Sequence, residues 1–384
     1  MNPMRFALLT LWLLSACPSA RAVTAPEQLL AGEFDTWFHR QVQAENILGA
    51  AFAVVSREGI IRIGTAGYTD TRRKQAINAD TAFRLASVSK TFAAELTALM
   101  VKEGRLGWDD PITRYLPDFR IKGDASRIHI RDLLGQSTGL MPHAYDNLIE
   151  AGLTAAEIQR KLSNLSIICA PGRCFSYQNS VFSLIEPVVE NVAANSYANL
   201  IDQRIFKPLD MRTASVGYEA FMSNSNRAEP HVLRHGQWKT IPVSPNYYRV
   251  APAAGVNASA RDMGKWLMAQ LGADPVVIAP EMVNTLITPR VRTRRELYRT
   301  GWKHILTDAH YGLGWRIYQI GAEQIAYHSG WVSGYRADVA FSTSHNIGIA
   351  VLMNVESTSI NLLTTRFWEL AFNTLSPAAV AMSP

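Results

Sequence analysis

Strand-like patterns lie at the two ends of the chain. Residues 49–55 and 60–66 are rich in apolar and β-branched side chains, and the polar segment Ser56-Arg57-Glu58-Gly59 between them predicts a β-hairpin. Four more strand-like segments lie near the other end, at 312–320, 324–328, 337–342 and 347–354. We expect the strands from both ends to join in one sheet.

Helical periodicity surrounds these strands. Apolar residues recur at helical spacing in 26–45, 91–102 and 360–372, whereas 105–290 mixes helices with Pro- and Gly-rich loops. The predicted fold class is α/β (α+β), with an antiparallel sheet formed from both termini, flanked by helices, and an inserted, mainly helical lobe at about 105–290. With 384 residues, 48% of them hydrophobic, the chain can bury a large core. We expect one domain over 23–375, a loose tail at 376–384, and a cleft between the sheet and the lobe.

The N-terminus has the pattern of an export signal. Arg5 precedes an apolar stretch at 6–14 and then small residues, and this stretch is too short for a stable membrane anchor. Ala20-Arg21-Ala22 fits cleavage of a signal peptide spanning 1–22, whereas Leu14-Ser15-Ala16-Cys17 fits a lipoprotein signal with Cys17 lipidated and attached to the membrane. Both alternatives predict an exported, periplasmic protein.

The distribution of basic residues and the cysteine count bear on which partners and cofactors the protein could bind. The net charge is +6, and the basic residues are scattered except for one run at Arg290, Arg292, Arg294, Arg295, Arg299 and Lys303. We interpret this run as a solvated face or loop, with attraction to an anionic cell-wall or membrane surface as the alternative; no motif supports nucleic-acid binding. In an oxidising compartment, Cys169 and Cys174 are expected to form a loop-closing disulfide. No histidine or carboxylate cluster lies near them, so we expect no metal and no cofactor.

The stretch Ser87-Val88-Ser89-Lys90 pairs a nucleophile with a base. It begins the predicted helix at 91–102, so the two side chains are neighbours at i and i+3. A lysine can take a proton from a serine only when its amine is neutral, which against a reference pKa of ~10.4 requires desolvation or nearby positive charge. The apolar helix supplies the desolvation. The alternative is a serine cap followed by an exposed lysine.

Two further motifs carry groups suited to acyl transfer. Tyr177-Gln178-Asn179 follows a Pro-Gly turn, and it offers a phenol that can act as a base and an amide that can hold both a lysine and a substrate carbonyl. Other Y-x-N sequences occur at 145–147 and 197–199. His328-Ser329-Gly330 ends a predicted strand just before Trp331, where glycine allows close approach of a substrate and a backbone N–H can serve an oxyanion hole.

A competing nucleophile is Ser137. It lies in Gly135-Gln136-Ser137-Thr138-Gly139, which matches the G-x-S-x-G elbow of α/β-hydrolases. That elbow needs a strand before it and a helix after it. The residues that follow, Met141-Pro142-His143, start a helix poorly, which favours Ser87.

With the three motifs in this order, residues 30–370 resemble the serine penicillin-recognising family: class C β-lactamases, D-alanyl-D-alanine carboxypeptidases and related esterases. Further matching segments are Arg84-Leu85-Ala86, Asp109-Asp110-Pro111-Ile112, Leu133-Leu134-Gly135-Gln136-Ser137-Thr138-Gly139-Leu140, Pro171-Gly172 and Phe206-Lys207-Pro208-Leu209. The resemblance selects Tyr177 among the Y-x-N sequences and places Ser137 in an ordinary family segment. The sequence departs from the family at H-S-G, where class C β-lactamases have K-T-G, and at Gln178, where Ser or Ala is common.

The resemblance implies a role for each site residue. Ser87 is acylated, Lys90 and Tyr177 shuttle the proton, Asn179 holds Lys90 and the substrate amide, and the N–H groups of Ser87 and Trp331 form the oxyanion hole. His328, Ser329 and Gly330 would bind substrate, and His328 would recognise a substrate carboxylate less well as the pH rises above about 6.

The protein is therefore expected to be a periplasmic acyl-serine hydrolase without a cofactor and a monomer. Its substrate would be a small molecule or peptidoglycan-derived, namely β-lactams or D-alanyl peptides. A carboxylesterase and a penicillin-binding sensor or wall-binding protein without turnover are the alternatives.

Overall fold

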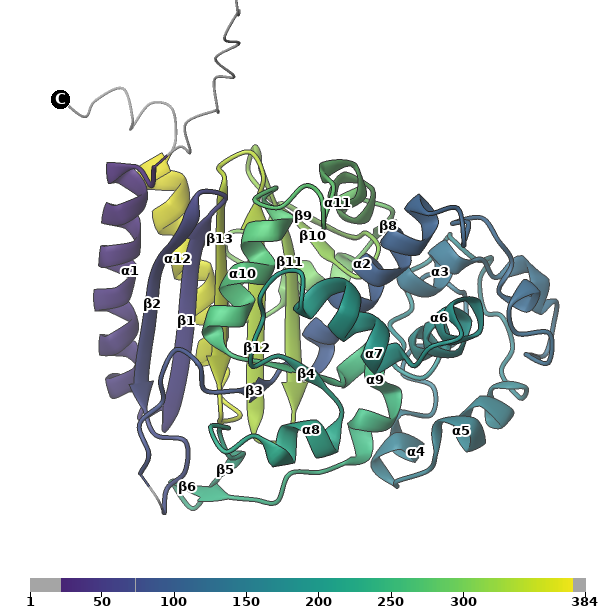
Figure 1. The fold of residues 1–384 in the computed structure, drawn as a ribbon, viewed down its shortest axis with the longest axis horizontal. Coiled ribbons are helices and arrows are strands. Elements are labelled where there is room, and N and C mark those ends of the chain that lie inside the picture. Colours follow the sequence, from purple (N-terminus) through teal and green to yellow (C-terminus); the bar gives the residue numbers. More distant parts are fainter. Residues whose placement is uncertain (1–21, 73, 376–384) are drawn as a thin grey trace, which may run out of the picture.

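An eight-stranded antiparallel sheet forms the centre of the protein, in a computed structural model that describes residues 22–72 and 74–375 (Figure 1). The strand order is β2-β1-β13-β12-β11-β10-β9-β8. The strands are β1 (Gly49–Ser56), β2 (Gly59–Gly67), β8 (Val291–Arg292), β9 (Asp308–Tyr311), β10 (Arg316–Ile320), β11 (Glu323–Val332), β12 (Tyr335–Ser342) and β13 (Ile347–Met353). The predicted fold class is confirmed. The apolar stretch of the predicted export signal, Cys17 and the predicted tail at 376–384 lie outside the described residues.

The sheet joins the two ends of the chain at one pair of strands. The N-terminal strand β1 pairs with the C-terminal strand β13, with Phe52 opposite Val351. Every residue of both strands is buried, so neither shows the alternation of a half-exposed strand. The hairpin predicted from 49–66 is present as β1 and β2.

The segment predicted as one strand at 312–320 is a turn followed by a strand. Gly314 has φ +74, and a Cβ built there would lie 2.5 Å from the Cβ of Ala94, so glycine lets this turn approach α2 (Ser89–Lys102). Strand β10 therefore begins only at Arg316. Strand β11 runs four residues past the predicted end at His328, because the polar residues that close the apolar pattern remain paired with β12.

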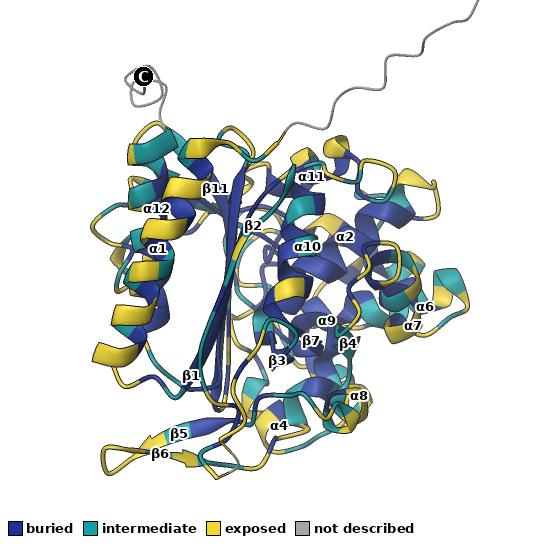
Figure 2. Ribbon diagram, turned by 60° about the vertical axis from the view of Figure 1, so that its left-hand side comes forward, coloured by how far each residue is buried: buried dark blue, intermediate teal, exposed yellow. Residues whose placement is uncertain are grey.

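Helices cover both faces of the sheet (Figure 2). On one face lie α1 (Ala25–Ala44), which is capped by Thr24 and Glu27, and α12 (Ser359–Leu375). On the other face lie α2 and α10 (Ala260–Gln270), and the ring of Phe92 stacks on Trp266 at 4.1 Å between them. No helix in the described part of the chain is both long enough and apolar enough to cross a bilayer.

The helical lobe is smaller than the sequence predicts. Its helices are α3 (Ile130–Leu134), α4 (Asp146–Glu150), α5 (Ala155–Leu162), α6 (Ile185–Ala193), α7 (Tyr197–Ile201), α8 (Tyr218–Ser223) and α9 (Ala251–Ala254), and α11 (Pro280–Ile287) packs on α2. Helix α10, which we placed in the lobe, packs on β1 and β13 instead. A Cβ at Gly264 would lie 3.2 Å from Ile60 Cδ1, which shows how closely α10 approaches the hairpin.

Two small sheets accompany the main sheet. One consists of β3 (Phe83–Arg84), β4 (Ser215–Val216) and β7 (Val256–Ala258), and the other of β5 (His231–Arg234) and β6 (Gln237–Thr240).

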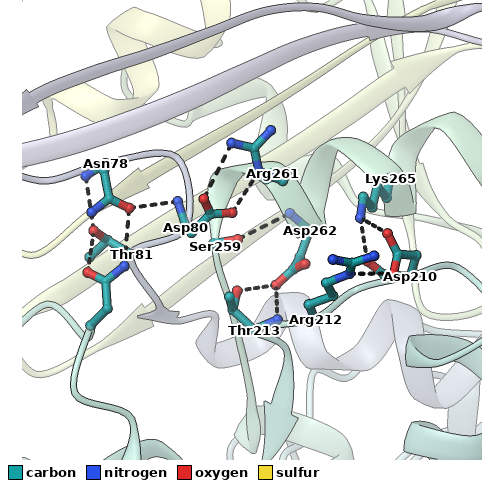
Figure 3. A network of polar contacts seen from close by, with 11 residues as sticks. Asn78, Asp80, Thr81, Asp210, Arg212, Thr213, Ser259, Arg261, Asp262 and Lys265 are labelled. Carbon is teal, nitrogen blue, oxygen red and sulfur yellow. Dashed lines mark hydrogen bonds and ion pairs between the residues drawn. The ribbon is translucent and has the colours of Figure 1, made fainter.

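A polar network fixes α10 to its surroundings (Figure 3). Arg261 Nε donates to Asp80 Oδ1 at 2.6 Å, and Lys265 Nζ donates to Asp210 Oδ2 at 2.7 Å. The buried carboxylate of Asp262 accepts a hydrogen bond from the backbone N–H of Thr213 at 3.1 Å. Helix α10 is therefore held to the segment before β3 and to the turn at 210–213, and the sheet and the lobe are joined through it.

Candidate active site

Ser87 lies in a 3-10 turn, Ala86–Val88, immediately before α2. Ala86 has φ +48, a left-handed conformation that costs a non-glycine residue energy and is typical of functional turns. Strand β11 passes close by, since a Cβ at Gly330 would lie 2.0 Å from the carbonyl oxygen of Leu85. Only glycine allows this approach, which brings the backbone at Trp331 next to the turn that carries Ser87.

Lys90 is wholly buried and has three polar neighbours. Its Nζ lies 3.3 Å from Ser87 Oγ, 2.8 Å from Asn179 Oδ1 and 3.1 Å from the carbonyl oxygen of Ala253. The last two atoms only accept hydrogen bonds, so they use the two N–H groups of a neutral amine. The lone pair of that amine is then left for the hydroxyl of Ser87.

The charge on Lys90 is disfavoured by its surroundings. Burial lowers the pKa of Lys90, and the charge of Arg316 acts in the same direction, while Tyr177 and Asp146 oppose the shift. Desolvation, the effect expected from the apolar helix, is the largest of these causes. Neutral Lys90 is the form that can take a proton from Ser87.

Tyr177 and Asn179 meet Lys90 from the loop after the disulfide. Lys90 Nζ lies 4.8 Å from the centre of the Tyr177 ring. Cys169 and Cys174 are joined by a disulfide, with their Cα atoms 6.5 Å apart, and this closes the loop that leads into Tyr177. Of the other Y-x-N sequences, Tyr145 precedes α4 and Tyr197 is buried in α7.

Ser137 is not in the setting of a nucleophile elbow. It follows helix α3 rather than a strand, and it is buried. Its backbone carbonyl accepts a hydrogen bond from the N–H of Gly172 at 2.7 Å, which ties the segment to the disulfide loop. The structure therefore gives Ser137 a supporting position beside that loop.

Ser87 opens into a cavity of about 1060 Å³ between the lobe and the end of the sheet. Tyr177, Asn179, Ser329 and Trp331 line it as well. Trp331 is 60% exposed and its Nε1 donates to Glu356, while the guanidinium of Arg336 lies 4.5 Å from the Trp331 ring. The cavity has room for a ligand much larger than a single amino acid.

Part of the basic run lines this cavity: Arg292, Arg294, Arg295 and Arg299. The first three are exposed, which agrees with the interpretation of the run as a solvated face. The wall carries seven arginines: Arg173, Arg292, Arg294, Arg295, Arg299, Arg316 and Arg336. The guanidinium of Arg316 lies 5.5 Å from the centre of the Tyr177 ring. Its side chain is only 11% exposed and pairs with Glu296, the acidic residue that interrupts the run. The run folds back against β9 and β10, and only its interruption by Glu296 in the sequence hinted at an inward partner.

His328 does not reach the cavity, which contradicts its expected contact with a substrate carboxylate. Its side chain is 0% exposed, with Nε2 3.0 Å from the hydroxyl of Tyr311 and Nδ1 2.9 Å from the carbonyl oxygen of Ser329. Burial holds the pKa of His328 well below its usual value, and the charges of Arg316 and Lys90 lower it further. His328 is therefore neutral, and the positive charge next to Tyr177 belongs to Arg316.

A second ionisable group lies on α2, outside the cavity. Glu95 is wholly buried, and Gln270 Nε2 donates to Glu95 Oε2 at 3.0 Å. No basic side chain in the described residues forms an ion pair with Glu95. Burial raises the pKa of Glu95 to about 7, which the hydrogen bond from Gln270 only partly offsets. Among residues 22–72 and 74–375, no group of three acidic, histidine or cysteine side chains comes together to hold a metal ion.

Comparison with known proteins assigns the family. The family profile described as Beta-lactamase matches residues 34–368, which is most of the chain. The chain belongs to the beta-lactamase family. This family is part of the serine penicillin-recognising superfamily, and its members are typically serine hydrolases.

This beta-lactamase family member is similar to Protein flp in sequence, and to a penicillin-binding protein homologue and the hydrolase EstCE1 in fold. Protein flp of Staphylococcus aureus (strain MRSA252) is 24% identical over 332 residues, covering 85% of this chain and 63% of the relative, so the chain spans less than two thirds of that protein. The octameric penicillin-binding protein homologue from Pyrococcus abyssi has a TM-score of 0.76 at 21% identity, covering 89% of this chain and 76% of that one. EstCE1, a hydrolase with promiscuous acyltransferase activity, has a TM-score of 0.74 at 19% identity, covering 91% and 99%.

Proposed function

We propose that this protein is an exported acyl-serine hydrolase that opens β-lactam rings or hydrolyses D-alanyl peptides through an acyl-enzyme on Ser87. The observation that carries the proposal is the contact between Ser87 Oγ and the fully buried Lys90 Nζ at 3.3 Å, on the wall of the large cavity. The apolar segment at 6–14 supports export to the periplasm.

In the proposed acylation, Ser87 Oγ attacks the substrate carbonyl and its proton passes to Lys90 Nζ. The N–H groups of Ser87 and Trp331, brought together by the close approach at Gly330, stabilise the oxyanion. The C–N bond of the substrate then breaks, and the proton moves from Lys90 through Tyr177 to the leaving nitrogen. Water hydrolyses the ester and regenerates Ser87.

The arginine-rich wall supports a substrate that carries an anionic group. Of the seven arginines, Arg299 and Arg316 share Glu296, whereas Arg294 and Arg295 form no ion pair within the described residues. Arg336 lies on the cavity wall near Ser329 and Trp331, so we propose it as the group that binds a substrate carboxylate in place of His328.

A carboxylesterase is the second candidate. Enzymes with K-T-G have a charged lysine at the position of His328, and a substrate carboxylate can bind to it. His328 is buried and neutral, so neutral esters are compatible with this site. The likeness to EstCE1 over 99% of its length agrees with this alternative in fold.

Intact mass after mixing with a penicillin tests the proposal. We expect a transient adduct whose mass is that of the penicillin, with loss of the adduct over time and accumulation of the hydrolysed drug. The S87A variant should form no adduct. A permanent adduct would favour a penicillin-binding sensor, and turnover of p-nitrophenyl acetate without any penicillin adduct would favour the esterase.

A further inference from the structure

A chain of hydrogen bonds continues from Lys90 to two residues that the proposed steps do not use. Asn179 accepts from Lys90 through Oδ1 and donates to Asp146 Oδ2 through Nδ2, at 3.0 Å. The same carboxylate oxygen lies 2.9 Å from His143 Nδ1. His143, Asp146 and Asn179 all line the cavity that contains Ser87.

The segment that carries the two residues is held in an unfavourable backbone conformation. His143 and Tyr145 have φ +57 and +64, and neither is a glycine. The backbone N–H of His143 donates to the carbonyl oxygen of Tyr177 at 2.8 Å, and the Gln178 amide donates to the carbonyl of Met141. Two left-handed residues within three consecutive positions persist only where surrounding contacts enforce them, and such conformations are concentrated at functional sites. Here the contacts come from the Tyr177 loop itself.

Asp146 determines which way the amide of Asn179 faces. An ionised carboxylate only accepts hydrogen bonds, so Asp146 must meet the NH₂ group of Asn179 and not its oxygen. The amide oxygen is then directed at Lys90, where it accepts one N–H of the neutral amine. Without Asp146 the amide could turn, its NH₂ group would face Lys90, and the lone pair of the amine would be drawn away from Ser87.

Asp146 also places a negative charge one amide away from Lys90. Its charge acts to raise the pKa of Lys90, against the larger effect of burial. Glu150, which lines the same cavity, is bonded instead to Tyr247 and does not belong to the chain of contacts. Glu296, the third carboxylate on the cavity wall, pairs with Arg299 and Arg316. Of these three carboxylates, Asp146 is the one that is hydrogen-bonded to Asn179 and through it to Lys90.

We propose that Asp146 and His143 form a positioning pair for the nucleophile, in which Asp146 orients Asn179 and adjusts the proton affinity of Lys90, while His143 holds Asp146 by donating from Nδ1. The inference rests on the proposed function, because it assigns the pair to the same serine–lysine reaction. The proton affinity of the base that activates Ser87 then depends on two residues that take no part in the bond-making steps.

The first test removes the charge of Asp146 while keeping the size of its side chain. The D146N variant keeps an acceptor for Asn179 but loses the charge, so the pKa of Lys90 should fall and the acidic limb of the kcat/KM profile should move to lower pH by about 1. The E150Q variant removes a carboxylate from the same cavity and should leave the limb in place. Equal shifts in both variants, or no shift in D146N, would overturn the role of Asp146.

The second test concerns His143. Replacing it with Ala removes the donor to Asp146, and we expect kcat/KM on the plateau to fall about tenfold, the effect of one lost hydrogen bond to a charged group. Asparagine can donate from a similar place, so H143N should recover most of the rate, whereas equal rates in H143A and wild type would overturn the pair.

The S87A variant is assayed alongside both tests. If S87A stays active, the proposed function fails. If S87A is inactive while D146N and H143A match wild type, only this inference fails.

Discussion

Glu95 makes the stability of the protein fall as the pH rises. In an unfolded chain its carboxyl has an ordinary pKa of 4.5, while in the fold burial raises the pKa to about 7. The folded state therefore still binds the proton at pH values where the unfolded state has lost it, so stability is highest below 4.5 and is lost progressively up to about 7. The total loss, at about 1.4 kcal/mol per pKa unit, is about 3 kcal/mol.

The E95Q variant tests this magnitude. Gln cannot ionise, is nearly the same size, and can still accept from Gln270, so the variant removes the pH dependence without leaving a cavity. Urea unfolding of both proteins at pH 5 and pH 8 gives four free energies of unfolding. The free energy of unfolding of E95Q minus that of wild type should be about 2 to 3 kcal/mol larger at pH 8 than at pH 5. Other titrating groups are shared by both proteins and cancel in this difference.

A difference between the two proteins that does not change with pH would refute the reasoning. It would mean that Glu95 has the same pKa in the folded and unfolded states, and that the buried side chain finds a compensating charge or opens to solvent. Penicillin turnover by E95Q at pH 7 serves as the control that the fold around α2 is intact, because Glu95 lies outside the cavity.

Four further outcomes can be checked. Because Ser137 supports the disulfide loop, S137A should retain most activity in the assay in which S87A is dead. Titration with Ellman's reagent of the unfolded, unreduced protein should find no free thiol at Cys169 or Cys174. Since His328 is neutral throughout, the ratio of kcat/KM for a penicillin to that for a neutral ester should stay flat between about pH 6 and 8, and a declining ratio would restore His328 as the carboxylate contact. The R336Q variant should raise KM for a penicillin about tenfold and leave a neutral ester unchanged, if one charged hydrogen bond is lost.

Local patterns in the sequence were enough to predict the contact between Ser87 and Lys90 and the strands β1 and β13. The spacing of Ser87 and Lys90 and the apolar runs of β1 and β13 each act within a few residues, so they can be recognised from the sequence. The same holds for Cys169 and Cys174, whose separation of five residues keeps the pairing local.

Contacts between distant segments were not predictable in this way. Asp146 meets Asn179 only because a strained turn folds onto the Tyr177 loop, and nothing in Tyr145-Asp146-Asn147 indicates that contact. Arg292, Arg294 and Arg295 are exposed, as expected for a solvated charge run, but the sequence did not indicate that they would face the cavity that contains Ser87. His328 was misjudged for the opposite reason: a strand-end histidine looked accessible, but Tyr311 and Ser329 enclose it.

The pairing of β1 with β13 has a consequence for how the protein folds during its synthesis. A chain is synthesised from its N-terminus, so Ser87 and Lys90 are made long before β11, β12 and β13 exist. Until then β1 has one edge without a partner, and the turn at Ser87 lacks the strand that Gly330 allows to approach it. Pairings between the two ends of a chain form slowly, and an unpaired strand edge invites aggregation. The protein should thus be inactive and prone to aggregation until its last strands are complete. A truncation before Ile347, which removes β13 and α12, should abolish both solubility and acylation.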